Sequence, residues 1–158
     1  MTIQKNKVLD LNLNLQFSLN PAQLEIYHDM HRFQIADCGR RFGKTNLAWI
    51  KSLIFMLEHP GCLLWWVAPY YKELAPASRT VKELTPPKLI AKKYEQSGKI
   101  RSLFLLNGSE IDFHSADRED SLRGMKLHGM VIDEAAALKA VVCKNTLSKK
   151  LTQLIRHG

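Results

Sequence analysis

One short segment constrains the fold more than any other: IADCGRRFGKTNLAW, at residues 35–49. Its Gly43, Lys44 and Thr45 match the end of the phosphate-binding loop pattern G-x-x-x-x-G-K-[ST], although Cys38 stands where that pattern opens with glycine. A loop of this kind lies between a strand and a helix, because its backbone N–H groups and the helix N-terminus together hold phosphate oxygens. The segment therefore predicts a strand, a tight turn and a helix in direct succession.

The sequences on both sides of this segment agree with that prediction. Phe33 and Ile35 alternate with polar residues in RFQIADC, which predicts a short strand over residues 32–38. The apolar residues of KTNLAWIKSLIFMLEH, residues 44–59, recur with a helical period. A surface turn that contains GKT by chance is the alternative interpretation, so a second motif has to decide.

Length and composition indicate one globular domain with a real core. The chain has 158 residues, of which 46% are hydrophobic and 24% charged. The first 16 residues lack the apolar segment of a signal peptide, and no apolar run reaches the ~18 residues of a membrane span. Three widely spaced cysteines, Cys38, Cys62 and Cys143, predict a reducing compartment, with no disulfide framework and no zinc site.

The formal net charge of +8 suggests a nucleic-acid partner only weakly. Residues 139–158 contain five basic residues and no acidic residue, so the other 138 residues carry only +3. The internal basic residues are interpreted as a solvated face, with a DNA or partner surface as the alternative. They are Lys82, Lys88, Lys92, Lys93, Lys99 and Arg101.

Further elements follow from local patterns. SLNPAQLEIYHDMH predicts a helix that Asn20 caps and that has Pro21 in its first turn. GCLLWWVAP, residues 61–69, is a continuous apolar run and predicts a strand buried on both faces. Residues 70–93 favour a helix that prolines interrupt. An Asn-Gly pair predicts an antiparallel hairpin over residues 105–113, and the three tryptophans are expected in the core.

The second motif is MVIDEAA, within residues 128–138, where Asp133 and Glu134 follow a buried strand. Ligands bind at the carboxyl ends of parallel strands. A P-loop ATPase needs an aspartate there for the Mg²⁺ shell, opposite the loop threonine Thr45, and a carboxylate that orients and deprotonates the attacking water. The two motifs, 89 residues apart with a buried strand between them, predict a P-loop NTPase of the α/β class. We expect a largely parallel sheet flanked by helices and incomplete at its C-terminus.

The chain resembles the ATPase domain of the large terminase subunit, the DNA-packaging motor of tailed phages. The resemblance covers residues 18–138 and rests on NPAQLEIY, CGRRFGKT, WWVAPYY and SLRGMKLHGMVIDEAA, in this order. Members of that family often lack the first P-loop glycine and carry arginine within the loop, as Arg40 and Arg41 do here. The resemblance implies a Mg²⁺-dependent ATPase that moves double-stranded DNA. It also implies a homo-oligomeric ring, a portal and a small terminase subunit as partners, and the cytoplasm of a bacterial host.

The resemblance also implies roles for single residues. Gln23 would contact adenine, and the loop residues Gly39, Arg40, Gly43, Lys44 and Thr45 would bind the phosphates and Mg²⁺. Arg123 in SLRG would reach the γ-phosphate of a neighbouring subunit as an arginine finger. Three alternatives stay open. Gln23 is an exposed helix glutamine, Arg123 is a surface arginine that forms salt bridges beside Glu119 and Asp120, or Arg40 or Arg41 acts as the finger in cis.

The sequence departs from the family after Leu138. We expect an arm at residues 1–17, a partial ATPase core at 18–138 and a divergent basic tail at 139–158, which lacks a coupling motif and a nuclease cluster. In this class a later strand separates the strand before the loop from the Asp-Glu strand, so the isolated chain is expected to hydrolyse ATP slowly or not at all. The tail indicates a truncated or frameshifted product, or alternatively a genuine short helix. An inactive remnant that at most binds nucleotide or DNA, and a helicase-type ATPase, are the other functional interpretations.

Overall fold

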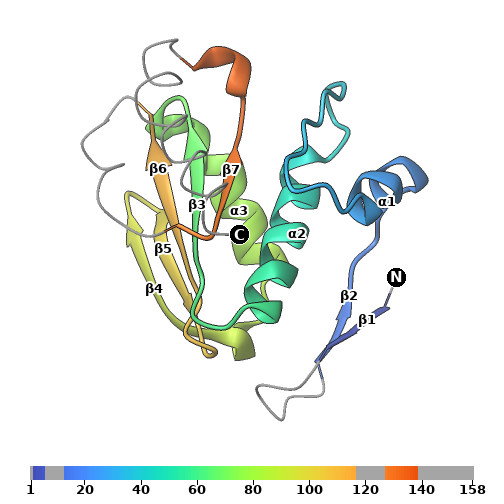
Figure 1. The fold of residues 1–158 in the computed structure, drawn as a ribbon. Coiled ribbons are helices and arrows are strands. Elements are labelled where there is room, and N and C mark those ends of the chain that lie inside the picture. The colour runs from blue at the N-terminus through green and yellow to red at the C-terminus, as the bar shows by residue number, and fades with distance from the viewer. Residues whose placement is uncertain (1, 6–12, 117–126, 139–158) are drawn as a thin grey trace.

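The computed structural model describes residues 2–5, 13–116 and 127–138, which form an α/β fold, as predicted (Figure 1). Helices α2 (Lys44–Glu58) and α3 (Leu74–Leu84) pack on one face of a five-stranded sheet, and the main hydrophobic core lies between them and that face. No helix in these described ranges is long and apolar enough to cross a membrane.

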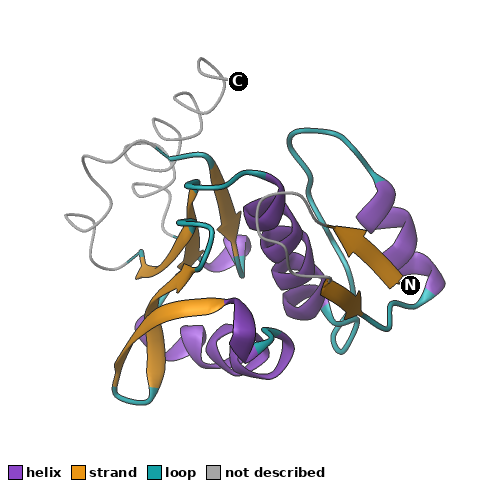
Figure 2. Cartoon of the chain, turned by 90° about the horizontal axis from the view of Figure 1, so that it is seen from below, coloured by secondary structure: helices purple, strands orange, loops and turns teal. Residues whose placement is uncertain are grey.

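The N-terminal residues form a separate unit of secondary structure. Strands β1 (Thr2–Lys5) and β2 (Leu13–Gln16) pair antiparallel with each other and not with the main sheet (Figure 2). Helix α1 (Pro21–His28) follows and packs against α2 on the side away from the sheet. The division into arm, core and tail stays a prediction, because the tail at 139–158 lies outside the described residues.

The main sheet is mixed rather than largely parallel. Its strands occur in the order β4-β5-β6-β3-β7, in which β3 runs parallel to both neighbours while β5 is antiparallel to β4 and to β6. The hairpin predicted at Asn107-Gly108 joins β5 to β6, and Gly108 has the positive φ of 80° that such a turn requires. The strands are β3 (Leu63–Ala68), β4 (Ile90–Gln96), β5 (Lys99–Leu105), β6 (Glu110–Ser115) and β7 (Gly129–Ile132).

Strand β3 confirms the prediction of a strand buried on both faces. All six of its residues are buried, and it pairs with β6 on one side and β7 on the other. Leu64, Trp66 and Ala68 face the helices. Leu63, Trp65 and Val67 face the other way, towards a second apolar cluster that includes Leu127. Trp49 on α2 is also fully buried, so the three tryptophans belong to the core, as expected.

The helix predicted over residues 70–93 is only partly correct. Helix α3 ends at Leu84, just before Pro86 and Pro87, which lack the N–H groups that a helix needs and restrict the residue before them. Residues 90–93 instead belong to β4, which pairs with β5 across a turn at Ser97 and Gly98. Pairing with a neighbouring strand decided this conformation, and the local sequence does not reveal it.

The strand predicted over residues 32–38 is absent from the structure. Ile35 is 97% exposed and Phe33 is 51% exposed, and the segment has no regular secondary structure. An extended segment becomes a strand only when a neighbour satisfies its backbone groups, and no described strand lies beside this one. For the same reason β7 is half-buried rather than buried: it pairs on one side only within the described sheet.

Candidate nucleotide-binding site

The predicted turn leads directly into a helix. Helix α2 begins at Lys44, immediately after Gly43, which has the left-handed φ of 84°. The turn before it also contains Arg41 at φ 64° and is closed by a hydrogen bond from Phe42 N to the carbonyl oxygen of Gly39 at 3.4 Å. The first N–H groups of a helix have no partner within the helix, and the helix dipole favours an anion there. The start of α2 therefore has the features of a phosphate site.

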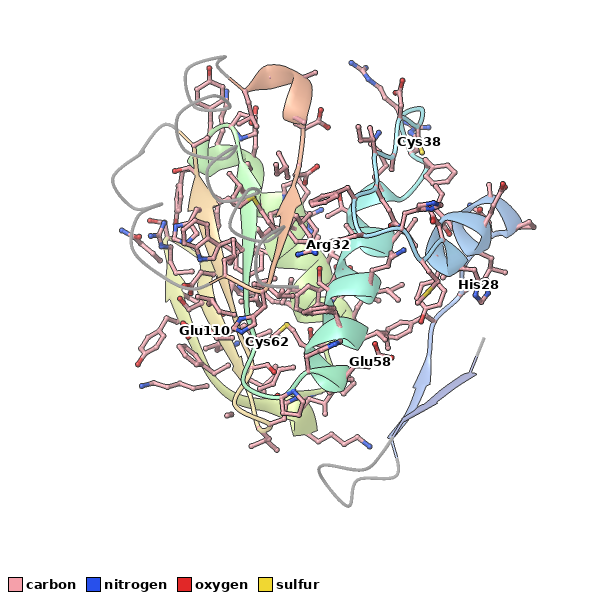
Figure 3. The ribbon with its side chains drawn as sticks, in the orientation of Figure 1. His28, Arg32, Cys38, Glu58, Cys62 and Glu110 are labelled. Atoms are coloured by element: carbon pink, nitrogen blue, oxygen red, sulfur yellow. The ribbon has the colours of Figure 1, made fainter. Side chains whose placement is uncertain are left out.

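The Lys44 side chain folds back over this loop. Its Nζ donates to the carbonyl oxygen of Cys38 at 2.7 Å and to that of Gly39 at 3.4 Å. Cys38 lies on the loop beside the start of α2, far from Cys62 near the other end of that helix (Figure 3). The ammonium is thus held by the loop itself, within reach of any anion that the loop binds.

Gln23 ties α1 to the loop. Its Oε1 accepts from Asn20 N and its own N–H donates to Asn20 Oδ1, both at 2.9 Å, which is a reciprocal capping box. Its Nε2 donates to the carbonyl oxygen of Phe42 in the loop, at 2.7 Å. Gln23 is only 8% exposed, so the alternative of an exposed helix glutamine is wrong, and the Asn20 cap is confirmed.

Gly43 leaves space for Gln23 as well as having a left-handed backbone conformation. A Cβ at this position would lie 2.6 Å from Gln23 Nε2, so the Gln23 amide would have to shift. At Gly39, by contrast, a Cβ would meet no atom within 4 Å. The two loop glycines therefore have different roles, and only the second permits the close approach of α1.

The Asp-Glu motif lies at the same end of the sheet as the start of α2 (Figure 1). Asp133 N donates to Val67 O at 2.9 Å, and Asp133 Oδ1 accepts from Glu134 N at 3.1 Å. Burial and the charge of Glu134 raise the pKa of Asp133, while the hydrogen bond from Glu134 N and the charge of the Lys44 ammonium act in the opposite direction. The charges of the two motifs, distant in sequence, therefore interact in the fold.

Glu134 has an unusual backbone conformation. It is exposed and has φ 49° and ψ 47°, just before a short 3-10 helix, Ala135–Ala137. A non-glycine residue in this left-handed region costs roughly 1–2 kcal/mol relative to the right-handed one. Strained residues of this kind often occur at functional sites. No sequence signal foretells the strain, because glutamate has no special preference for this conformation.

The remaining predicted residues are placed as follows. Thr45 lies half-buried in the first turn of α2, and Arg40 and Arg41 are exposed in the turn before it. Arg123 lies outside the described residues. The 2–5, 13–116 and 127–138 ranges contain no group of three acidic, histidine or cysteine side chains that could hold a metal. A hydroxyl and one carboxylate still suit Mg²⁺, which binds proteins through one or two carboxylates plus substrate phosphates.

Lys51 supports the site, although no sequence motif indicated it. This residue lies seven positions after Lys44, two turns along the same face of α2. Its Nζ donates to the carbonyl oxygens of Ile26, Tyr27 and Asp29, at 2.9, 3.2 and 3.2 Å. A lysine among the periodic apolar residues of the helix could have indicated a buried contact, but the partners of Lys51 depend on how α1 packs.

No family model matches the chain. It is 25% identical to the large terminase subunit of Thermus virus P23-45, an alignment that covers 91% of this chain and 33% of the relative. For the large terminase subunit of Thermus phage G20c the identity is 24%, with the same coverage. The chain thus spans about a third of the length of these curated relatives.

The fold agrees with this sequence similarity. The ATPase domain of the large terminase of Thermus phage P74-26 superposes with a TM-score of 0.70 at 24% identity, covering 91% of this chain and 63% of that one. A mutant of the same domain also gives a TM-score of 0.70, at 23% identity. The chain is thus similar in sequence to phage large terminase subunits along nearly its whole length, and it has the fold of a large terminase ATPase domain.

Proposed function

We propose that this chain is the ATP-binding and ATP-hydrolysing module of a viral DNA-packaging motor, which couples hydrolysis to the translocation of double-stranded DNA. The observation that carries the proposal is that Lys44 at the start of α2 and Asp133 at the end of β7 lie at the same end of the sheet (Figure 1). Packing brings together one cationic and one acidic motif at the end of the sheet where P-loop ATPases bind nucleotide. The similarity to large terminase subunits supports the same assignment.

Different residues of the site would bind the phosphates and the Mg²⁺ ion. The backbone of the 39–43 turn and the ammonium of Lys44 would hold the β- and γ-phosphates, while Thr45 and Asp133 would hold Mg²⁺. The chemistry that Mg²⁺ would supply there, held by Thr45 and Asp133, is neutralisation of negative charge on the phosphates. A cation would also relieve the repulsion between Asp133 and Glu134, which raises the pKa of Asp133.

Glu134 would orient and deprotonate the attacking water, because its exposed carboxylate follows the metal-binding carboxylate directly. The positive charge needed at the γ-phosphate would come from Arg123 of a neighbouring subunit, or in cis from Arg40 or Arg41, which are exposed beside the loop. We further propose, from the similarity to large terminase subunits, that the chain acts in a homo-oligomeric ring with a portal and a small terminase subunit as partners.

For DNA, the surface that fits best is the β4–β5 ribbon. Two of its cations lie over aromatic rings: the exposed Lys92 has its Nζ 4.4 Å from the Tyr94 ring centroid, and the partly exposed Lys99 has its Nζ 4.3 Å from that of Tyr71, which precedes α3. Lysines of this kind neutralise backbone phosphates, and the binding they supply weakens as salt increases. The basic residues named in the sequence therefore gather largely on one ribbon, which favours the partner surface over the solvated face.

Calorimetric titration of the full chain with Mg·ATP tests the binding step. Lys44→Ala should weaken binding about tenfold or more, because it removes a charged donor from the phosphates. Lys88→Ala, which changes an exposed lysine remote from the loop, should leave the affinity unchanged. Equal ATP affinity for wild type and Lys44→Ala would refute the assignment of the loop.

The hydrolysis step is tested with the same proteins by steady-state ATPase assays with and without double-stranded DNA. In any preparation that turns over, Glu134→Gln should keep ATP binding and lose turnover. Turnover retained by Glu134→Gln would refute the role of Glu134. ATP binding by the wild-type chain without turnover under any condition would favour the inactive remnant.

A further inference from the structure

Lys51 joins two helices that both border the candidate site. Four oxygens lie within hydrogen-bond distance of its ammonium: the carbonyl oxygens of Ile26 and Tyr27 in the last turn of α1, that of the C-cap residue Asp29, and Gln34 Oε1 at 2.8 Å. Because an ammonium has three N–H groups, at least two of these acceptors share one of them. The last carbonyls of a helix have no partner within it and carry its negative dipole end. A single cation from α2 therefore caps the C-terminal end of α1.

This cap is partly buried and does not belong to the phosphate-binding machinery. Burial lowers the pKa of Lys51, and the charge of Asp29 counteracts part of that effect. The Tyr27 ring centroid lies 6.0 Å from the same ammonium. Gln34 accepts from Lys51 and also donates to the carbonyl oxygen of Asp29. These two hydrogen bonds connect the segment that leads to the loop with Lys51 and with the end of α1.

Helix α1 is thereby held at both ends relative to α2. Near its N-terminus, Gln23 Nε2 donates to Phe42 O in the loop, and near its C-terminus the Lys51 cap fixes the carbonyls one turn further along. Because an eight-residue helix behaves as a rigid body, loss of the C-terminal tie would let α1 rotate about the Gln23 contact. Lys51 thus helps to fix the position of α1, and with it the position of the Gln23 side chain beside the loop.

Gln23 retains hydrogen-bonding capacity in this position. Its contacts with Asn20 and Phe42 use one of its two amide N–H groups and one of the two lone pairs of its oxygen. A side-chain amide with one donor and one acceptor matches the N6 and N7 edge of adenine. The Gln23 amide lies directly against Gly43, so a base beside it would belong to the nucleotide whose phosphates the loop holds.

We propose that Lys51 is a positioning residue for the base of the nucleotide: it holds α1 so that Gln23 can bind an adenine, and it contributes nothing directly to triphosphate binding. This inference rests on the proposed function of the loop. A purely structural role would destabilise the protein and weaken every ligand of the site alike. A positioning role would instead weaken the binding of a ligand that has a base and leave the binding of a ligand that has only phosphates unchanged.

The test is calorimetric titration of the full chain with Mg·ATP and, separately, with Mg·tripolyphosphate, which has no base. Lys51→Met removes the charge and keeps much of the length, and it should weaken ATP binding about tenfold while tripolyphosphate affinity stays within about twofold. Lys88→Met, the matched control on an exposed lysine, should change neither. Lys51→Arg, which keeps the charge in a planar shape that fits the carbonyls less well, should give an intermediate loss for ATP alone.

Each outcome decides between the alternatives. Equal losses for both ligands in Lys51→Met, or unchanged ATP affinity, would overturn the positioning role. If Lys51→Met does not melt cooperatively, Lys51→Arg carries the test, and an ATP loss equal to its tripolyphosphate loss overturns the proposal. A wild-type chain that binds neither ligand would refute the proposed function itself, a result distinct from failure of Lys51 alone.

Discussion

Strand β3 and residues 33–38 lie on either side of α2 in the sequence. Residues 33–38 lead into the phosphate loop, and β3 pairs with β7, which leads into Asp133. In β3 every residue is buried and both edges are paired, with Trp66 at 0% exposure. In the 33–38 segment Ile35 is 97% exposed and no strand is formed. The two halves of the site are therefore supported in different ways.

The acidic half depends on the sheet, whereas the loop half depends on side chains. Asp133 is positioned by backbone pairing of β7 with β3, including its own hydrogen bond to Val67. The loop is positioned by Gln23 and Lys44, each of which donates to backbone carbonyls of the loop. A phosphate loop can thus keep its turn and its helix without a paired strand before it, provided that such side-chain contacts hold it.

The largest expected effect would test whether this contrast in support is real. Trp66→Ala removes the largest side chain at the centre of β3 and should lower the free energy of unfolding by about 3–5 kcal/mol. Ile35→Ala, in the unpaired segment, should change it by no more than about 0.5 kcal/mol. Urea denaturation of both variants measures the difference. A large loss in Ile35→Ala would mean that the segment packs in solution, and the contrast would then be wrong.

A smaller effect would sharpen the description of the loop half. Gly43→Ala should lower the free energy of unfolding by about 1–3 kcal/mol, because alanine is strained at φ 84° and its Cβ would displace Gln23 Nε2. Gly39→Ala is the matched control: its Cβ meets open space, so thermal melting should hardly change. Similar melting temperatures for the two variants would show that Gln23 does not hold the loop against α1.

The smallest effect concerns the acidic half and depends on pH. Burial and Glu134 raise the pKa of Asp133 above its ordinary value of 3.8, so the folded state holds this proton more tightly than the unfolded state. Its contribution to stability is fully present below 3.8 and is lost as the pH rises through the folded pKa. Asp133→Asn should therefore melt at a higher temperature than wild type at neutral pH.

That advantage should disappear as the pH falls towards the ordinary carboxyl pKa, which melting curves over a pH series would reveal. A lower melting temperature for Asp133→Asn at neutral pH would indicate that the carboxylate makes a stabilising contact that outweighs its burial. The same carboxylate is the proposed Mg²⁺ ligand, so the variant should gain stability and lose metal-dependent nucleotide binding together.

The sequence by itself determined the elements whose signals are local. The helix after Gly43 follows from its apolar period, the cap of α1 from Asn20, and the β5–β6 hairpin from Asn107 and Gly108. Strand β3 follows from an uninterrupted apolar run. These features require only neighbours along the chain, and for the same reason the residues of the two site motifs could be named in advance.

The tertiary structure alone decided what depends on neighbours in space. Residues 32–38 resemble a strand in sequence, but no described strand lies beside them, while residues 90–93 became a strand because β5 lies beside them. The strained conformation of Glu134 and the capping of α1 by Lys51 likewise follow from packing. A hydrogen bond between segments distant in the chain leaves no periodic pattern in either segment, so only the folded arrangement reveals which residues support the site.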